Sequence, residues 1–112
     1  MTIVCVDLDG TINADPGFYK AECTGLMAHG HEVHVLSGNA KAEHALAQLG
    51  MVRGRDFTRV STVPVHHIAA AKVAYMKRVG STHLIDNSGK NIKAARKAGF
   101  TAQWHRPPKK KE

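Results

Sequence analysis

The chain has 112 residues, of which 43% are hydrophobic and 22% charged, and its net charge is +7. This length suits one domain with a single core and leaves no room for a second lobe. No apolar run approaches the roughly 20 residues that cross a bilayer, and the start of the chain lacks the basic segment and cleavage site of a signal peptide. We therefore expect a cytoplasmic protein without a membrane partner, in which Cys5 and Cys23 are packed thiols rather than a disulfide or a metal site.

Apolar runs typical of strands alternate with helical patterns from the first residues onward. Residues 3–8 are continuous, apolar and rich in β-branched side chains, as in a strand buried on both faces. An amphipathic helix is predicted from about 17 to 29, because its apolar side chains recur at helical spacing. A second strand over 32–36 and a helix over about 40–49 follow.

The alternation continues to the end of the chain. The remaining predicted elements are a weak strand, a helix opened by a proline, a strand, a basic helix and a last strand, over residues 56–61, 64–79, 82–85, 90–98 and 100–104. Residues 1–104 should form the domain, and residues 105–112 a flexible basic tail.

This order of elements predicts an α/β fold. We expect a three-layer, Rossmann-like domain with a central parallel sheet of about five strands and right-handed crossovers. In such sheets the functional groups gather at the carboxyl ends of the strands. Three polar clusters each begin where an apolar strand ends: Asp7 with Asp9, residues 37–39, and Asp86 with Asn87. These clusters should therefore meet at one edge of the sheet.

Asp7 and Asp9 are the most informative pair of side chains. Asp7 lies within or at the end of a buried strand, where an unpaired carboxylate is strongly unfavourable. If the strand is still extended, Asp9 lies on the same face, and the two carboxylates would repel each other without a cation. Together with Asp86 they would form an all-oxygen site suited to Mg²⁺. Two solvated turn aspartates are the alternative interpretation.

Lys72 lies in the middle of the apolar stripe of its predicted helix, whereas Lys77 and Arg78 project from the opposite side. The stripe consists of Val65, Ile68, Ala69, Tyr75, Met76 and Val79. A lysine on such a stripe must either reach solvent past the helix edge or pair with an anion. The carboxylates and a bound phosphate are its candidate partners.

Four segments, in this order, resemble the motifs of the haloacid-dehalogenase (HAD) superfamily. Val-Asp-Leu-Asp-Gly-Thr-Ile at 6–12 is similar to the first motif, and Leu-Ser-Gly-Asn at 36–39 to the second. Lys72, fourteen residues before Asp86, resembles the third, and residues 84–92 resemble the fourth. The resemblance covers residues 2–104, and four motifs in order are far more specific than any one of them.

The resemblance implies a Mg²⁺-dependent phosphomonoester hydrolase that works through an aspartyl-phosphate. Asp7 would attack phosphorus, and Asp9 would protonate the leaving oxygen and later take a proton from the hydrolytic water. The Asp7 side chain, the Asp9 backbone carbonyl and Asp86 would hold Mg²⁺.

The resemblance also implies a phosphate-binding set. The Ser37 hydroxyl and the Gly38 amide would bind phosphoryl oxygens, and Lys72 would neutralise charge on the nucleophile and on the transferring group. Four more polar residues are expected to support the site from its surroundings, namely Thr11, Asn39, Asn87 and Asn91.

Two departures from the family pattern affect these expectations. Many relatives carry a second acid in the fourth motif, at a position that Asn87 or Asn91 occupies here. An amide oxygen can hold a metal-bound water but brings no negative charge, so metal affinity should be lower. No segment is long enough to form a cap domain, so the site should be open, with at most a short flap near residues 12–18.

The charged residues are unevenly distributed along the chain, and their distribution helps to predict which class of molecule binds. Residues 1–70 carry five Lys or Arg and seven Asp or Glu, whereas residues 71–112 carry eleven and two. A basic half of this kind often binds nucleic acid, although a solvated face with a soluble tail has the same composition. The expected substrate is a phosphorylated molecule, preferably a nucleotide or a nucleic-acid-end phosphate, with a sugar phosphate or a phosphoprotein as the other candidates.

A catalytically weak HAD-like binding or regulatory module is the alternative function. Asn87 favours it, and the intact Asp7, Asp9 and Lys72 argue against it. A receiver domain phosphorylated on aspartate fits poorly, because its acidic pair and its phosphorylated residue come from successive strands.

Overall fold

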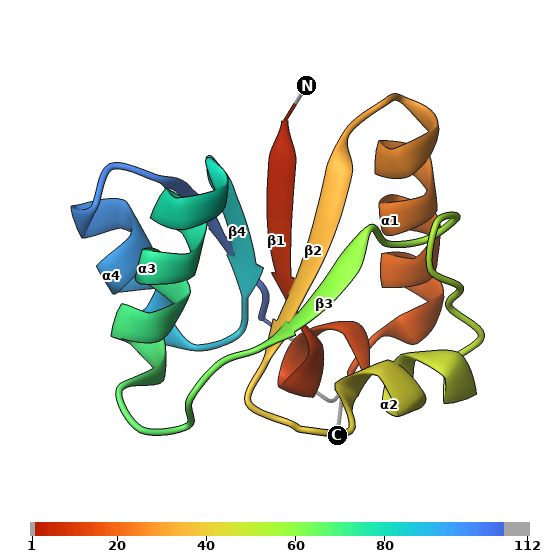
Figure 1. Ribbon diagram of the computed structural model, residues 1–112, viewed down its shortest axis with the longest axis horizontal. Helices are drawn as coiled ribbons and strands as arrows, with labels where there is room; N and C mark the ends of the chain where they lie inside the picture. Colours follow the sequence, from red (N-terminus) through yellow and green to blue (C-terminus); the bar gives the residue numbers. More distant parts are fainter. Residues whose placement is uncertain (1, 107–112) are drawn as a thin grey trace, which may run out of the picture.

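The computed structural model describes residues 2–106, which form an α/β domain of three layers (Figure 1). The central sheet has five strands, all parallel, in the order β3-β2-β1-β4-β5. The strands are β1 (Ile3–Asp7), β2 (Glu32–Ser37), β3 (Arg59–Thr62), β4 (His83–Asp86) and β5 (Thr101–Trp104). The predicted fold class is confirmed.

Helices cover both faces of the sheet. α1 (Pro16–Ala28) and α2 (Ala42–Gln48) lie on one face, and α3 (Ile68–Val79) and α4 (Gly89–Lys97) lie on the other (Figure 1). A tight loop, η1 (Leu8–Ile12), connects β1 to the start of α1. No helix in the described part of the chain is long and apolar enough to cross a membrane.

The central strand β1 is buried on both faces, as its continuous apolar sequence predicts. Val4 and Val6 pack in the cluster beneath α1 and α2, whereas Cys5 packs in the cluster beneath α3 and α4, because successive side chains of a strand point to opposite faces. Cys23 is buried in the first cluster, so the two free cysteines lie in different cores. The expectation of packed thiols is confirmed.

Two predicted boundaries are wrong. The third strand is Arg59–Thr62 rather than 56–61, because the buried Asp56 closes the preceding loop by accepting a hydrogen bond from Val52 N at 2.7 Å. α3 begins at Ile68 rather than at Pro64, because His67 has a left-handed conformation with φ of 56°.

Because α3 begins later than predicted, one residue of the predicted apolar stripe lies outside the helix. Val65 lies in this loop rather than on the helix, and it is 66% exposed. The other elements begin and end within about two residues of their predicted bounds.

The end of the domain extends past residue 104. His105 N donates to Asp86 O at 2.8 Å, and the Tyr19 hydroxyl forms a hydrogen bond with His105 Nδ1 at 2.6 Å. The Arg106 guanidinium lies 3.9 Å from the centre of the Trp104 ring. The rest of the predicted basic tail, residues 107–112, lies outside the described residues.

Candidate functional site

A cleft of about 460 Å³ lies where β1, β2 and β4 end. The sequence-predicted site residues on its wall are Asp7, Asp9, Gly38, Asn39, Lys72, Asp86, Asn87 and Asn91. Ser37 and Thr11, the other two, are buried directly behind this wall, where they contact Asp9 and Asp7. The parallel strands thus bring the three polar clusters to one edge of the sheet, as the sequence predicts.

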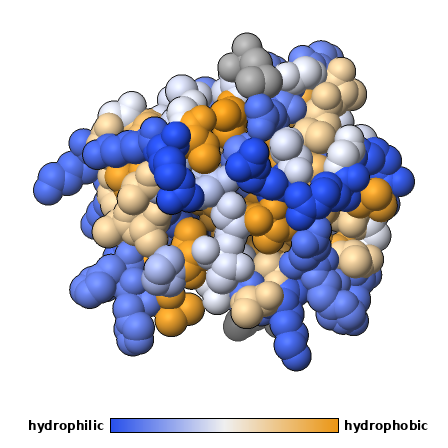
Figure 2. All heavy atoms as spheres, viewed as in Figure 1, coloured by the Kyte–Doolittle hydropathy of each residue, from blue (hydrophilic) through white to orange (hydrophobic). Residues whose placement is uncertain are grey.

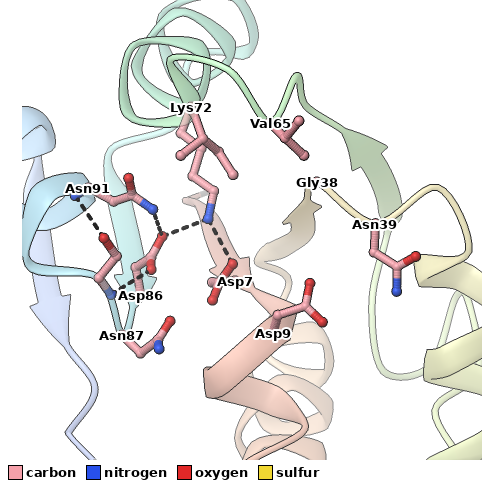
Figure 3. A pocket seen from close by; sticks show the side chains of 11 residues that line it. Asp7, Asp9, Gly38, Asn39, Val65, Lys72, Asp86, Asn87 and Asn91 are labelled. Carbon is pink, nitrogen blue, oxygen red and sulfur yellow. Dashed lines mark hydrogen bonds and ion pairs between the residues drawn. The ribbon is translucent and has the colours of Figure 1, made fainter.

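The Lys72 ammonium lies between two carboxylates at the base of this cleft. Its Nζ is 2.8 Å from Asp7 Oδ1 and 2.7 Å from Asp86 Oδ2 (Figure 3). The lysine side chain is only 1% exposed. The predicted helical phase is confirmed, since Lys77 and Arg78 of the same helix are exposed. One ammonium with two carboxylates has a net charge of −1, so this buried trio can still attract a cation.

Both oxygens of the Asp7 carboxylate are engaged. Lys72 donates to Oδ1, and the buried Thr11 hydroxyl donates to Oδ2 at 3.1 Å. Burial raises the pKa of Asp7 to about 6, an effect that the Lys72 ammonium opposes and the neighbouring Asp86 carboxylate increases. The two hydrogen bonds orient the carboxylate and favour its ionised form, in opposition to the effect of burial.

Asp86 connects Lys72 to the start of α4. Besides the lysine, it accepts hydrogen bonds from Ser88 N at 2.9 Å and from Asn91 Nδ2 at 3.0 Å. Asn91 is 5% exposed, and its Oδ1 has no hydrogen-bond partner within residues 2–106. A buried acceptor normally has a donor such as a water or a ligand group. Asn91 lies on the cleft wall, so a molecule bound in the cleft could supply this donor.

The Asn87 amide reaches both acids of the first segment. With its nitrogen turned toward them, it donates to Asp7 Oδ2 at 2.9 Å and to the Asp9 carbonyl oxygen at 3.1 Å. In the opposite orientation the amide oxygen would face these two oxygens, an arrangement that only a cation between them would favour. Gly10 lies so close beneath this amide that a Cβ there would be 2.3 Å from Asn87 Nδ2, and Gly10 has a φ of +80°. The turn after β1 therefore requires glycine, which allows the amide to approach.

These oxygens fit a small divalent cation. With the Asn87 oxygen turned toward them, the Asp7 carboxylate and the Asp9 carbonyl oxygen would be repelled by it without a cation, and Mg²⁺ prefers such oxygen donors. The donors at hand are carboxylate, carbonyl and amide oxygens. No cluster of three His, Cys, Asp or Glu side chains with metal-binding geometry is found in the part of the chain that the structure describes.

Ser37 contacts Asp9 rather than the open cleft. Its side chain is buried, and its Oγ donates to Asp9 Oδ2 at 3.0 Å while accepting from Asn39 N at 3.0 Å. Asp9 itself is exposed, so this hydrogen bond holds a carboxylate at the surface of the cleft. Gly38, the next residue, presents its backbone to the same cleft.

Three residues of the cleft wall are absent from the sequence-based set: Val65, Ile68 and Ser88. Ser88 caps α4 by accepting a hydrogen bond from Asn91 N at 3.5 Å, and a serine before a helical pattern is a recognisable signal for this role. Ile68 and Val65 carried no such signal, because the sequence pattern assigned both to the buried stripe of the helix.

Comparisons with known proteins identify the fold. No family model and no curated protein matches the chain. An uncharacterized protein from Corynebacterium glutamicum is similar in structure, with a TM-score of 0.69 and 19% identity over 95% of this chain and 85% of that chain. A HAD family enzyme from Bacteroides thetaiotaomicron, in complex with magnesium and inorganic phosphate, has a TM-score of 0.62 and 11% identity over 98% of this chain and 96% of that chain.

A magnesium complex of the same Bacteroides enzyme matches over a smaller share, with a TM-score of 0.58 and 15% identity over 82% of this chain and 54% of that chain. At these identities the similarity establishes the fold, which is HAD-like.

Proposed function

We propose that the chain is a Mg²⁺-dependent phosphomonoester hydrolase that forms an aspartyl-phosphate on Asp7. The observation that carries this proposal is the buried Lys72 ammonium, which bonds two carboxylates from different strands at the base of a cleft. A desolvated charge cluster of this kind is costly for folding and is typical of functional sites. The fold supports the proposal, because the HAD family enzyme that shares it was crystallised with magnesium and phosphate.

Asp7 is the nucleophile in this proposal. One of its carboxylate oxygens bonds to phosphorus as the ester oxygen departs, and the product is the aspartyl-phosphate. Lys72 and Thr11 keep the carboxylate in position. The Asp7 side chain, the Asp9 carbonyl oxygen and Asp86 would hold Mg²⁺, with the Asn87 oxygen as a further donor, and the ion would supply positive charge to the phosphoryl oxygens.

Asp9 transfers protons on the exposed side of the same site. It gives a proton to the departing ester oxygen, and it then takes a proton from the water that attacks phosphorus and releases Asp7. Ser37 holds one carboxylate oxygen of Asp9, which leaves the other available to the substrate. The Gly38 amide and the Lys72 ammonium bind the phosphoryl oxygens, and the Ser37 hydroxyl would join them only by giving up its hydrogen bond to Asp9.

A nucleotide or a nucleic-acid end is the substrate class that the surface charge favours. α4 starts directly after Asp86, and its buried side chains Ile92 and Ala95 turn its basic side chains outward. The basic residues of this helix are Lys90, Lys93, Arg96 and Lys97. In Figure 2 hydrophilic side chains project from several sides of the molecule, including the side where α3 and α4 lie. Basic side chains on such a surface bind the backbone phosphates of a nucleic acid largely independently of its base sequence.

A catalytically weak binding or regulatory module is the second candidate. It is favoured by Asn87, which stands where a second acid would add negative charge beside Asp7.

Hydrolysis of p-nitrophenyl phosphate by the purified chain decides between the two. The proposed enzyme turns the ester over with Mg²⁺ and stops when a chelator removes the metal. A chain that binds Mg²⁺ and inorganic phosphate without turnover is a binding module.

A further inference from the structure

The side of the cleft away from the carboxylates is apolar, and the segment that leads into α3 forms it. Val65 and Ile68 are the aliphatic side chains of the cleft wall. Four large hydrophobic residues are exposed in the described chain: Phe18, Val52, Val65 and Trp104. Val65, at 66%, is the most exposed of the four, and it is the one that lines this cleft. Figure 3 shows it on the far side of the site from Asn87.

The position of Val65 is fixed by the backbone around it. A Cβ at Gly38 would lie 2.8 Å from Val65 Cγ1 and 3.6 Å from Ile68 Cδ1, so both side chains rest on the glycine backbone. Val63 N donates to Ser37 O at 2.9 Å, which ties the start of the loop to the end of β2. The loop thus holds an exposed aliphatic group beside the backbone that is proposed to bind phosphate.

His67 closes this loop in a costly conformation. Its φ of 56° is the one positive φ of a non-glycine residue between residues 2 and 106, and its side chain makes no capping bond to α3. A left-handed conformation is unfavourable for a non-glycine residue and persists where the surroundings require it. Here it allows α3 to begin at Ile68, with Val65 directed over Gly38.

The two sides of the cleft therefore suit different parts of a phosphate ester. In the proposed function the phosphoryl group is attracted to the Lys72 ammonium and to the Mg²⁺ that the oxygen donors would hold. The group attached to the ester oxygen then extends along the opposite side, where Val65 gains from contact with carbon and not with hydroxyl groups.

We infer that Val65 and Ile68 form a leaving-group subsite that selects phosphate esters with an apolar face next to the ester oxygen. This inference rests on the proposed phosphatase function and concerns the same cleft. It favours a carbon-rich ester over the sugar ester of a nucleotide, so it is an alternative to the nucleotide substrate class. Val65 is a specificity-determining residue: it distinguishes an aryl or similarly carbon-rich ester from the ester of a small polyol. Loss of an apolar contact in such a pocket reduces kcat/KM for the preferred substrate by about tenfold.

The test measures kcat/KM for p-nitrophenyl phosphate and for glycerol 3-phosphate, together with the inhibition constant of inorganic phosphate. The variants are Val65→Ala, Val65→Thr, which keeps the shape but adds a hydroxyl, and Val52→Ala. Val52 is 51% exposed and lies outside the cleft, so it is the matched control. Inorganic phosphate has no leaving group and reports on the phosphoryl position alone.

The inference predicts that both Val65 variants lower kcat/KM for the aryl ester about tenfold relative to the polyol ester. The inhibition constant of inorganic phosphate stays within about twofold in these variants, and Val52→Ala changes none of the three values. An unchanged ratio between the esters overturns the inference, as does an inhibition constant that rises as much as kcat/KM falls, since Val65 would then only shape the Gly38 backbone. If the wild-type chain turns over neither ester, the proposed function fails and the subsite fails with it.

Discussion

The Lys72 ammonium donates to Asp7 Oδ1 at 2.8 Å, although the two residues are 65 positions apart in the chain. The contact joins α3 to the end of β1, and both side chains are removed from solvent. A hydrogen bond from an ammonium stabilises the ionised form of a carboxylate, and in the proposed function it supplies positive charge where phosphoryl transfer needs it.

Lys72→Ala is expected to lower kcat for p-nitrophenyl phosphate by about 10²–10³-fold, the usual effect of removing one preorganised donor. It also leaves Asp7 and Asp86 without their shared partner, so thermal stability at neutral pH should fall. Lys77→Ala, five residues along the same helix and exposed, is the control and should change neither value. Equal activity of the two variants would show that the Lys72 contact has no catalytic role.

Ser37→Ala removes the hydrogen bond that holds Asp9. We expect kcat to fall about tenfold to a hundredfold, because proton transfer by a positioned acid contributes on the order of 10²–10⁴. Ser37→Thr, which keeps the hydroxyl, should restore most of the activity. The inhibition constant of inorganic phosphate separates two roles of this serine: it rises if the hydroxyl binds phosphate, and it stays constant if the hydroxyl acts only through Asp9.

Asn87→Asp adds a negative charge beside Asp7 Oδ2 and the Asp9 carbonyl oxygen. The concentration of Mg²⁺ at half-maximal activity should fall about tenfold, because one more carboxylate strengthens a site of oxygen donors. Gln48→Glu, at the exposed end of α2, makes the same change in net charge away from the cleft. If both variants shift the Mg²⁺ dependence equally, Asn87 does not face the metal.

Asp56 should contribute to stability in a pH-dependent way. Its buried carboxylate bonds Arg55, Thr24 and Val52 N, and hydrogen bonding from the Arg55 guanidinium is the main reason that its pKa is lowered to about 2. A pKa that is lower in the folded chain stabilises the fold above the unfolded value of about 3.9, and this contribution is lost as pH falls toward 2.

Asp56→Asn is therefore expected to reduce the free energy of unfolding by about 1–3 kcal/mol at pH 7. Urea denaturation at several pH values should show this difference shrinking below pH 4 or so. Glu22→Gln, on the exposed part of α1, is the control. A difference that grew on acidification would contradict the assigned role of the carboxylate.

Lys93→Glu combined with Lys97→Glu tests the basic surface of α4. If the natural substrate is a nucleic-acid end, KM for a 5′- or 3′-phosphorylated oligonucleotide should rise and its salt dependence should weaken, because fewer counterions are released on binding. Turnover of p-nitrophenyl phosphate should barely change. The pair Lys20→Glu and Arg59→Glu, on α1 and β3, makes the same change in charge on other elements. Equal effects of the two pairs would indicate general charge rather than a binding surface.

Periodicity and strand-end position were sufficient to predict the fold and the meeting of Asp7, Lys72 and Asp86. A parallel sheet aligns the ends of its strands, and the 3.6-residue period of α3 determines which lysine faces inward. Pairings that depend on loop conformation were beyond this kind of inference. Ser37 meets Asp9 because β2 ends beside the turn after β1, and the left-handed His67 depends on how its loop packs against Gly38.

The start of the third strand is a second feature that the local sequence could not predict. The sequence pattern predicts Asp56 in the strand, because an apolar residue follows it. In the structure its carboxylate instead bonds backbone and side chains of its own loop and of α1. Such bonds satisfy a buried acid only in one three-dimensional arrangement, which the local sequence does not specify.

The turnover of Asp7→Asn tests the central claim most directly. An amide oxygen is a far poorer nucleophile than a carboxylate, so Mg²⁺-dependent hydrolysis of p-nitrophenyl phosphate should fall by about 10⁴-fold or more, as when the nucleophile of another covalent enzyme is removed. The circular dichroism spectrum should stay that of the wild type, and Asp15→Asn, an exposed acid before α1, should keep full activity. An Asp7→Asn chain that is folded and still hydrolyses the ester at a substantial rate would contradict an aspartyl-phosphate on Asp7.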